Sequence, residues 1–174
     1  MKIHSFTLST ILLTFFLIQQ IESKEMVKKP NVILFLIDDL GWSDLSLTGS
    51  KFHETPNVDR LAREGAFFSD AYAASSVCSP SRASILTGKY PSRIKMTYIS
   101  GTSGPKGPGY RLNAPKIVGN INPKDITLAE ALRSHKYKTV HIGKWHLQNH
   151  TDQGKTHYPE KHGFDINIAG FRMG

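Results

Sequence analysis

Apolar residues gather in short blocks along the chain, and the spacing within each block predicts the secondary structure. Residues 31–37 form a continuous run rich in β-favouring side chains, which stops abruptly at Asp38 and Asp39. A run of this kind is typical of a strand buried on both faces of a parallel sheet. Residues 66–73, which are apolar and aromatic, predict a second strand, and residues 138–142 predict a third.

The first predicted helix lies between the first two predicted strands. Thr55 suits the N-cap and Pro56 the first helical position, and Gly65 follows the end. Three apolar residues between these signals share one helical face. We therefore expect a short amphipathic helix here.

Two further helices are predicted later in the chain. Pro80 suits a first helical turn and Gly88 ends that segment, which places Cys78 at or just before a helix N-terminus. Thr127 and Glu130 have the spacing of a capping box before an apolar run. Residues 100–122, which lie between these two helices, are rich in Gly and Pro and predict a long loop, of a length that is functional or mobile in compact domains.

Strands that alternate with short helices predict an α/β fold with a mostly parallel sheet flanked by helices. In such folds ligands gather beyond the carboxyl ends of the strands. Asp38, Asp39, Lys144 and His146 each follow the end of a predicted strand, and the helix start at Cys78 is placed to join them. We therefore expect these five residues at one rim of the sheet.

Taken alone, the polar residues after the strands allow two interpretations. Asp38 and Asp39 supply two hard carboxylate oxygens, which suits Ca²⁺ or Mg²⁺. Adjacent acidic residues after a strand are also common as turn formers or caps. Residues 143–146 are equally compatible with a strand-end turn that contains a solvated Lys and a packed Trp.

The first 23 residues predict a signal peptide. Lys2 precedes an apolar run over residues 6–18, and Ser23 suits a small-residue cleavage position. The run is shorter than the about 20 apolar residues that span a bilayer. We therefore expect residues 1–23 to be removed and residues 24–174 to be exported, without a stable membrane span. The destination would be extracellular, periplasmic or lysosomal or ER-luminal, depending on the host. An uncleaved anchor or an ordinary buried helix is the alternative.

The 174-residue chain carries a formal net charge of +8, from 22 Lys and Arg against 14 Asp and Glu. Such a charge attracts anions. The basic residues are scattered, and the sequence has no zinc-finger spacing, aromatic RNA-binding signature or basic repeat, so we expect no nucleic-acid partner. A sulfated or phosphorylated substrate fits an exported protein better. A charge that only maintains solubility is the alternative.

The single cysteine, Cys78, cannot form an internal disulfide, which is the usual use of cysteine in exported proteins. It opens the sequence Cys-Ser-Pro-Ser-Arg, which ends at Arg82. A helix N-terminus and a nearby Arg are surroundings typical of a reactive cysteine, whereas a lone cysteine is otherwise often a small buried apolar residue.

The motif Cys-x-Pro-x-Arg at residues 78–82, continued by residues 83–89, closely resembles the signature of the formylglycine-dependent sulfatases of the alkaline phosphatase superfamily. Further segments resemble sulfatase segments in their usual order, namely residues 31–42, 55–65, 143–146 and 162–165. The resemblance covers nearly all of residues 31–174. It implies that residues 24–174 are the N-terminal part of a sulfatase catalytic domain with an alkaline phosphatase-like fold, incomplete in this chain.

The resemblance implies a hydrolase that cleaves sulfate monoesters of carbohydrates or aryl groups. A separate formylglycine-generating enzyme would oxidise Cys78 to an aldehyde. Its hydrate would attack sulfur with one oxygen and expel the sulfate with the other, which splits one displacement into two steps. Arg82 would steady the modified residue, Lys144 would reach both it and the sulfate, and His146 would hydrogen-bond the hydroxyl that loses a proton.

The resemblance also implies a divalent metal, with Ca²⁺ preferred. Asp38, Asp39 and an oxygen of the modified Cys78 would bind it, lowering the pKa of the attacking hydroxyl and offsetting charge on the sulfuryl oxygens.

Complete sulfatases have further metal-binding and sulfate-binding residues that cannot be assigned within these 174 residues. We therefore expect this chain alone to be inactive or nearly so. Two other functions stay open, a formylglycine-dependent phosphonate or phosphate monoesterase and a non-catalytic binder of sulfated polysaccharide. The sequence does not specify the sulfate ester, the host or the oligomeric state. Asn149 begins a glycosylation sequon, to which we assign no function.

Overall fold

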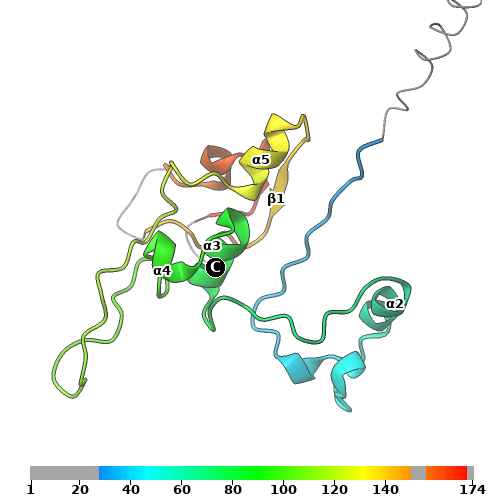
Figure 1. The fold of residues 1–174 in the computed structure, drawn as a ribbon, viewed down its shortest axis with the longest axis horizontal. Helices are drawn as coiled ribbons and strands as arrows, with labels where there is room; N and C mark the ends of the chain where they lie inside the picture. Colours follow the sequence, from blue (N-terminus) through cyan, green and yellow to red (C-terminus); the bar gives the residue numbers. More distant parts are fainter. Residues whose placement is uncertain (1–27, 150–155, 172–174) are drawn as a thin grey trace, which may run out of the picture. The chain divides into compact units, whose positions relative to one another are not determined.

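The computed structural model describes residues 28–149 and 156–171. The chain divides into two compact units, residues 1–37 and 38–174. All helices and strands of the described residues belong to the second unit (Figure 1). In chain order they are η1 (Trp42–Asp44), η2 (Ser46–Thr48), α2 (Pro56–Glu64), α3 (Cys78–Thr87), α4 (Pro91–Ile94), α5 (Leu128–Ser134), β1 (Val140–Ile142), η3 (Pro159–His162) and β2 (Ile166–Ile168).

Two of the sequence predictions concern residues that are not described. The predicted signal peptide, residues 1–23, lies outside the described residues, as do the last two residues of the sequon that begins at Asn149. Among the residues that are described, none of the helices is both long and apolar enough to cross a membrane.

The strand predicted over residues 31–37 is wrong for this structure. The segment has no strand partner among the described residues, and its apolar side chains are exposed, from 42% for Leu36 to 82% for Phe35. An apolar run indicates that its side chains favour burial, but a strand also needs a neighbouring backbone with which it can form hydrogen bonds. The described part of the chain does not provide that neighbour.

The strand predicted over residues 66–73 is also wrong, for the same reason. The segment is irregular, and Phe68 is 74% exposed. Phe67 stacks on Trp42 with a ring-centroid distance of 6.1 Å. One aromatic residue of the segment therefore packs against a neighbouring 3-10 helix and not within a sheet. β-propensity describes how side chains fit a pleated surface and does not create one.

Helix α2 has the predicted boundaries. Pro56 is its first residue, and the N–H of Gly65 donates to the carbonyl of Leu61 at 2.9 Å to close it. Thr55 occupies the N-cap position, but its hydroxyl donates to Asp59 Oδ1 at 3.0 Å and does not bond a helix N–H. The apolar face is exposed in the described structure, with Leu61 at 68%.

The capping box before α5 is present as predicted. Thr127 N–H donates to Glu130 Oε2 at 2.7 Å, and Glu130 N–H donates to Thr127 Oγ1 at 3.2 Å. The Thr127 hydroxyl also donates to the carbonyl of His162 at 2.7 Å, which ties the start of α5 to the end of η3. A polar side chain therefore joins two segments that lie 35 residues apart.

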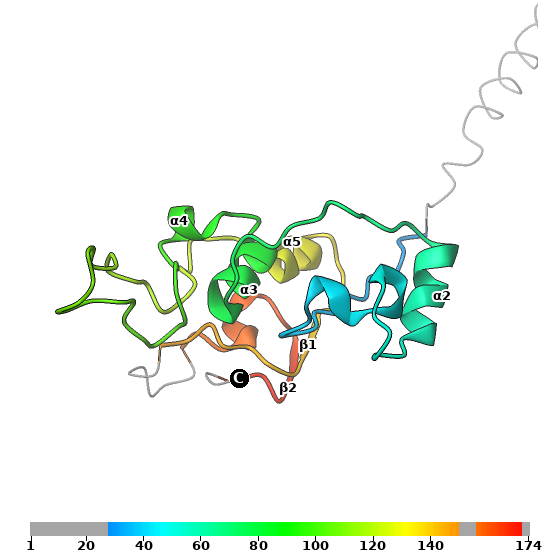
Figure 2. The same cartoon turned by 90° about the horizontal axis from the view of Figure 1, so that it is seen from below.

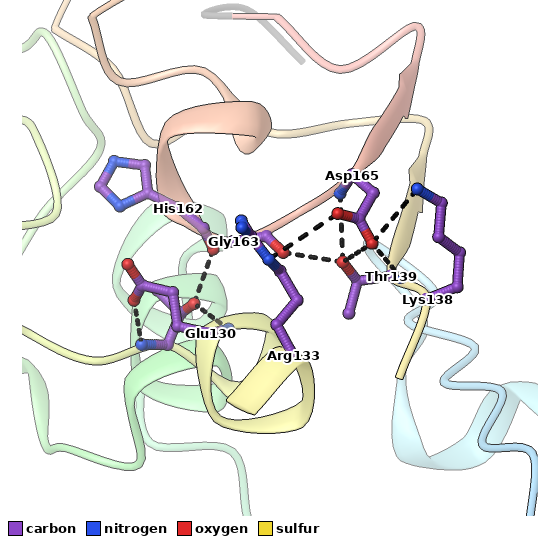
Figure 3. A network of polar contacts seen from close by, with 8 residues as sticks. Glu130, Arg133, Lys138, Thr139, His162, Gly163 and Asp165 are labelled. Atoms are coloured by element: carbon purple, nitrogen blue, oxygen red, sulfur yellow. Dashed lines mark hydrogen bonds and ion pairs between the residues drawn. The ribbon is translucent and has the colours of Figure 1, made fainter. Parts of the chain in front are cut away.

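The sheet is small and parallel. β1 pairs with β2 in the register Val140↔Ile166, His141↔Asn167 and Ile142↔Ile168 (Figure 2). Thr139 fixes the entry to this pair, since its hydroxyl donates to the carbonyl of Gly163 at 2.7 Å and its N–H donates to Asp165 Oδ2 at 3.0 Å (Figure 3). The third predicted strand is thus confirmed in a shorter form, and the α/β class with a parallel sheet is confirmed for the described residues.

The hydrophobic core lies between α3 and the segment that follows β1. It consists of five buried side chains with Leu86, Ile94 and Phe164 packed against them, namely Ala83, Met96, Ile121, Trp145 and Leu147. Residues 100–122 contain no helix or strand, as predicted, and Ile121 anchors the end of this loop in the core. The packing fixes the predicted signature helix against the predicted strand-end residues.

Candidate functional site

Helix α3 presents Cys78 at its first residue. Val77 is the extended N-cap residue, and Gly88 ends the helix in the left-handed conformation with φ 65°, which a glycine adopts without steric cost. The thiol is free and half-buried. The first turn of a helix has backbone N–H groups without partners inside the helix and the positive end of its dipole. Cys78 therefore lies in an environment suited to an anionic group, as the sequence predicted.

The segment after β1 turns sharply, so that a buried residue alternates with half-buried residues. Gly143 has φ 91°, and its N–H donates to the carbonyl of Ile168 at 2.9 Å. Trp145 is 1% exposed, and its indole N–H donates to the carbonyl of His157 at 2.7 Å. The buried Trp145 anchors the turn, and the half-buried Lys144 and His146 lie on either side of it.

The two segments meet at Cys78 and His146. Cys78 Sγ lies 3.3 Å from His146 Nδ1, within hydrogen-bond distance for sulfur. The backbone of the turn is bound to α3 as well, since Arg82 Nη1 donates to the carbonyl of Lys144 at 2.6 Å. The structure thus brings together all four residues that the sequence predicted to be catalytic.

Asp38 joins this group through its carboxylate. Its Oδ2 lies 2.5 Å from Lys144 Nζ and 3.5 Å from Arg82 Nη2. The hydrogen bond from Lys144 is the main cause that lowers the pKa of Asp38, with the charge of Arg82 adding to it, while partial burial acts in the opposite direction. Lys144 is therefore not the solvated residue of the alternative interpretation.

Asp39 lies beside Asp38 in the same turn with φ 56°, a left-handed conformation that Asp tolerates better than most residues. Its side chain is exposed, and within residues 28–149 and 156–171 it makes no hydrogen bond or ion pair. The two adjacent acids do form a turn, as the alternative interpretation held, and neither caps a helix.

The predicted metal ligands fit a hard cation in kind but not in number. Asp38 and Asp39 offer carboxylate oxygens, which Ca²⁺ and Mg²⁺ prefer. In the described part of the chain, however, no three His, Cys, Asp or Glu side chains are grouped closely enough to hold one ion, so Cys78 is not gathered with the two aspartates. Ca²⁺ takes 6–8 oxygen ligands. The remaining ligands of a tight site are not among these residues.

Sequence reasoning missed two parts of this arrangement. The first is the bridge that Asp38 forms to Lys144 and Arg82, because ion pairs between distant segments leave no local pattern. The second is Ser79, which is fully buried and donates to the carbonyl of His146 at 3.0 Å. Its only sequence signal is its place between two motif residues.

Comparison with known proteins adds independent information. The family model described as Sulfatase matches residues 30–172. N-acetylgalactosamine-6-sulfatase of Sus scrofa is 44% identical over 136 residues, which are 78% of this chain and 24% of that protein. Arylsulfatase G of Mus musculus is 38% identical over 145 residues, which are 83% of this chain and 24% of that protein. This chain therefore spans about a quarter of the length of the curated relatives it matches.

A solved structure gives the same picture at the level of the fold. The crystal structure of Ps i-CgsB superposes with a TM-score of 0.66 at 36% sequence identity, covering 83% of this chain and 29% of that one. The parallel strand pair and the helices of the described residues thus have the arrangement of part of a larger α/β domain.

Proposed function

The chain belongs to the sulfatase family, and from that premise we propose that its full-length protein hydrolyses sulfate monoesters, with residue 78 as the nucleophile. The observation that carries the proposal is the position of Cys78 at the start of α3, with Sγ 3.3 Å from His146 Nδ1. A nucleophile beside a base is the arrangement that covalent catalysis requires. Lys144 and Arg82 add positive charge at the same site.

We propose that Cys78 is converted to formylglycine by a formylglycine-generating enzyme. Once formed and hydrated, this residue supplies two hydroxyl oxygens, one to attack sulfur and one whose later deprotonation releases the sulfate. The free, half-buried thiol at a helix N-terminus supports this assignment.

The roles of the surrounding residues follow from their contacts. His146 holds or accepts a proton at Nδ1, because that atom faces the side chain of residue 78. The ammonium group of Lys144, which lies on the carboxylate of Asp38 at the edge of the site, would oppose the charge that builds up on the sulfuryl oxygens. Arg82 holds the carbonyl of Lys144 and faces Asp38, so it fixes the position of both.

We propose that Asp38 and Asp39 provide two ligands of a divalent cation, with Ca²⁺ preferred, and that residue 78, whose thiol is not grouped with them in the described structure, adds an oxygen after conversion. The cation supplies positive charge that lowers the pKa of a bound hydroxyl and offsets charge on sulfate. The exposed carboxylate of Asp39 supports this role. Because two carboxylates make an incomplete shell, the 174 residues alone are expected to be inactive or nearly so.

Carbohydrate and aryl sulfates are the proposed substrate classes. Relatives named N-acetylgalactosamine-6-sulfatase and arylsulfatase G support these two classes. We also propose that residues 1–23 are a cleaved signal peptide and that the protein is exported. N-terminal sequencing of the secreted protein tests this, since a start near Lys24 is expected and an intact Met1 would contradict it.

Peptide mass spectrometry tests the central proposal. The full-length protein is co-expressed with the maturing enzyme and digested. Conversion of the thiol to an aldehyde lowers the mass of the peptide that contains Cys78 by about 18 Da. Rates on matched aryl sulfate and aryl phosphate esters are measured on the same sample. An unconverted thiol in a protein that still hydrolyses sulfate esters would overturn the proposed nucleophile, and a preference for the phosphate ester would overturn the proposed reaction.

A further inference from the structure

Ser79 is a completely buried hydroxyl residue in the first turn of α3. Its Oγ donates to the carbonyl of His146 at 3.0 Å and accepts from the N–H of Ser100 at 2.9 Å. The hydroxyl therefore uses both its donor and an acceptor position, and it links three segments of the chain. A buried hydroxyl with both functions satisfied is held in one orientation.

The backbone of His146 has an unfavourable conformation that its surroundings must stabilise. His146 has φ 59°, in the left-handed region that residues with a side chain adopt rarely and at an energetic cost. Such a conformation persists only where the surroundings determine it. The N–H of His146 donates to the carbonyl of Phe171 at 3.3 Å, and its carbonyl accepts from Ser79. The same conformation leaves Nδ1 3.3 Å from Cys78 Sγ.

Helix α3 holds the turn at two points one helical turn apart. Residues three positions apart lie on the same helix face, and Ser79 and Arg82 bind the carbonyls of His146 and Lys144 respectively. Arg82 also faces Asp38. In contrast, the side chain of Ser79 bonds only the backbone of His146 and Ser100 among the described residues. His146 is thus the only residue of the site that the Ser79 hydroxyl contacts in the described structure.

We propose that Ser79 is a positioning residue that holds His146 in its left-handed conformation and thereby keeps the imidazole against residue 78. This inference rests on the proposed function for its effect on turnover, but the geometric part concerns the thiol form as well. Ser79 does not touch the reacting atoms. Its removal acts through His146.

The thiol form gives a test that does not depend on sulfatase activity. Without the maturing enzyme, the full-length protein keeps the thiol of Cys78, and its alkylation by iodoacetamide is followed at neutral pH. The ring of His146 lies against Sγ, so its displacement changes the access of the reagent to the half-buried thiol. Ser79→Ala and His146→Ala should each change the alkylation rate several-fold in the same direction, and the double variant should react at the rate of His146→Ala alone.

Ser84 provides a matched control on the same helix. It is also buried, at 8% exposure, but its Oγ has no hydrogen-bond partner among the described residues. Ser84→Ala removes the same atom from a comparable environment and should leave the alkylation rate unchanged. Ser79→Thr keeps the hydroxyl and should retain most of the rate. If thermal unfolding shows that Ser79→Ala is unfolded at the assay temperature, all variants are compared at a lower temperature at which it is folded.

The converted enzyme gives the second readout. Ser79→Ala should lower kcat on an aryl sulfate by about tenfold to a hundredfold, because a misplaced catalytic group costs factors of this size, while KM stays within about twofold. Conversion of Cys78 is measured on each sample by peptide mass, so a maturation defect is separated from a positioning defect. The loss should disappear in the His146→Ala background.

Each outcome decides the inference. If Ser79→Ala changes the alkylation rate and kcat by the same factor in the presence and in the absence of His146, Ser79 has a general structural role and the inference is overturned. Unchanged alkylation in both Ser79→Ala and His146→Ala would also overturn it, since the contact between Cys78 and His146 would then be without effect. If the wild-type protein has no sulfatase activity while the alkylation pattern holds, the proposed function fails and the positioning role of Ser79 stands.

Discussion

The ammonium group of Lys144 lies 2.5 Å from Oδ2 of Asp38, although the two residues are separated by more than 100 positions in the sequence. Both side chains are about 30% exposed, at 28% for Lys144 and 30% for Asp38. The pair therefore lies at the edge of the site, where it is open to ligands but partly shielded from solvent. It joins the proposed metal-binding turn directly to the proposed sulfate-binding lysine.

Lys144→Ala should lower the rate of sulfate ester hydrolysis by a factor of about 100 to 1,000, because a cation aimed at transition-state charge contributes this much. The change should leave folding intact, since partly exposed ion pairs contribute little to stability. kcat on an aryl sulfate and the melting temperature of the full-length protein are measured together. Lys138→Ala is the control, because Lys138 pairs with Asp165 at 3.6 Å and is 69% exposed. A loss confined to the melting temperature would contradict the assignment of Lys144.

Removal of the metal should abolish activity, and substitution of the proposed ligand Asp39 should reduce metal binding. Dialysis of the full-length protein against a chelator should stop turnover, and added Ca²⁺ should restore it. Asp39→Ala should reduce the bound metal measured by elemental analysis, with only the small loss of melting temperature that alanine brings at φ 56°, because the Asp39 side chain makes no hydrogen bond or ion pair in the described structure. Asp70→Ala is the control, an exposed aspartate bonded to Ser69. Normal metal content in Asp39→Ala would reject the assignment.

The sequence predicted those elements whose signals are local. Pro56 and Gly65 bound α2, Gly88 closes α3, and Thr127 with Glu130 opens α5, each where the sequence placed it. Caps and breakers act through φ restrictions and hydrogen bonds within a few residues, so their positions can be read without knowledge of the fold.

The strands and the cross-links of the site depend on distant residues and were predicted less well. Residues 31–37 have the composition of a strand but no partner among the described residues, whereas residues 140–142 pair with β2, which the sequence pattern did not reveal. The convergence of Cys78, Lys144 and His146 could be anticipated because a parallel fold gathers strand ends, whereas Arg82 was assigned to the site only through the resemblance of its motif. The hydrogen bond from Ser79 to His146 could not be, since it joins positions 67 residues apart.

Arg82→Lys should disturb both the site and the fold. The guanidinium of Arg82 donates to the carbonyl of Lys144 with Nη1 and faces Asp38 with Nη2, and lysine cannot reproduce this fork. The side chain is 10% exposed, so the lost bond should cost about 1–3 kcal/mol of unfolding free energy and lower kcat as Lys144 shifts. Arg133→Lys is the control, because Arg133 is 50% exposed and its ion pair with Asp165 spans 3.7 Å. Equal effects of the two substitutions on denaturant unfolding and kcat would show that the fork geometry is unimportant.

The last prediction concerns His162, which packs against the tryptophan that anchors the catalytic turn. Its ring centroid lies 5.7 Å from that of Trp145 and 5.6 Å from that of His157, and its Nε2 is buried without a hydrogen-bond partner among the described residues. Burial is the main cause that lowers the pKa of His162 from its ordinary value of 6.5 to about 4, with His157 adding to the effect and Glu130 opposing it. The imidazole is therefore neutral in the folded protein at neutral pH.

A base whose pKa is lower in the folded state than in the unfolded state takes up a proton on unfolding. Between pH 6.5 and about 4 the unfolded chain binds the proton and the folded protein does not, so stability falls as the pH decreases through this window. For His162 the loss should reach about 1 to 3 kcal/mol at the acid end. His162→Phe keeps an aromatic ring beside Trp145 but has no proton to bind. Its unfolding free energy, measured by denaturant titration at several pH values, should therefore decrease less than that of the wild type. Parallel curves for the wild type and His162→Phe would show that His162 is not held neutral by its burial.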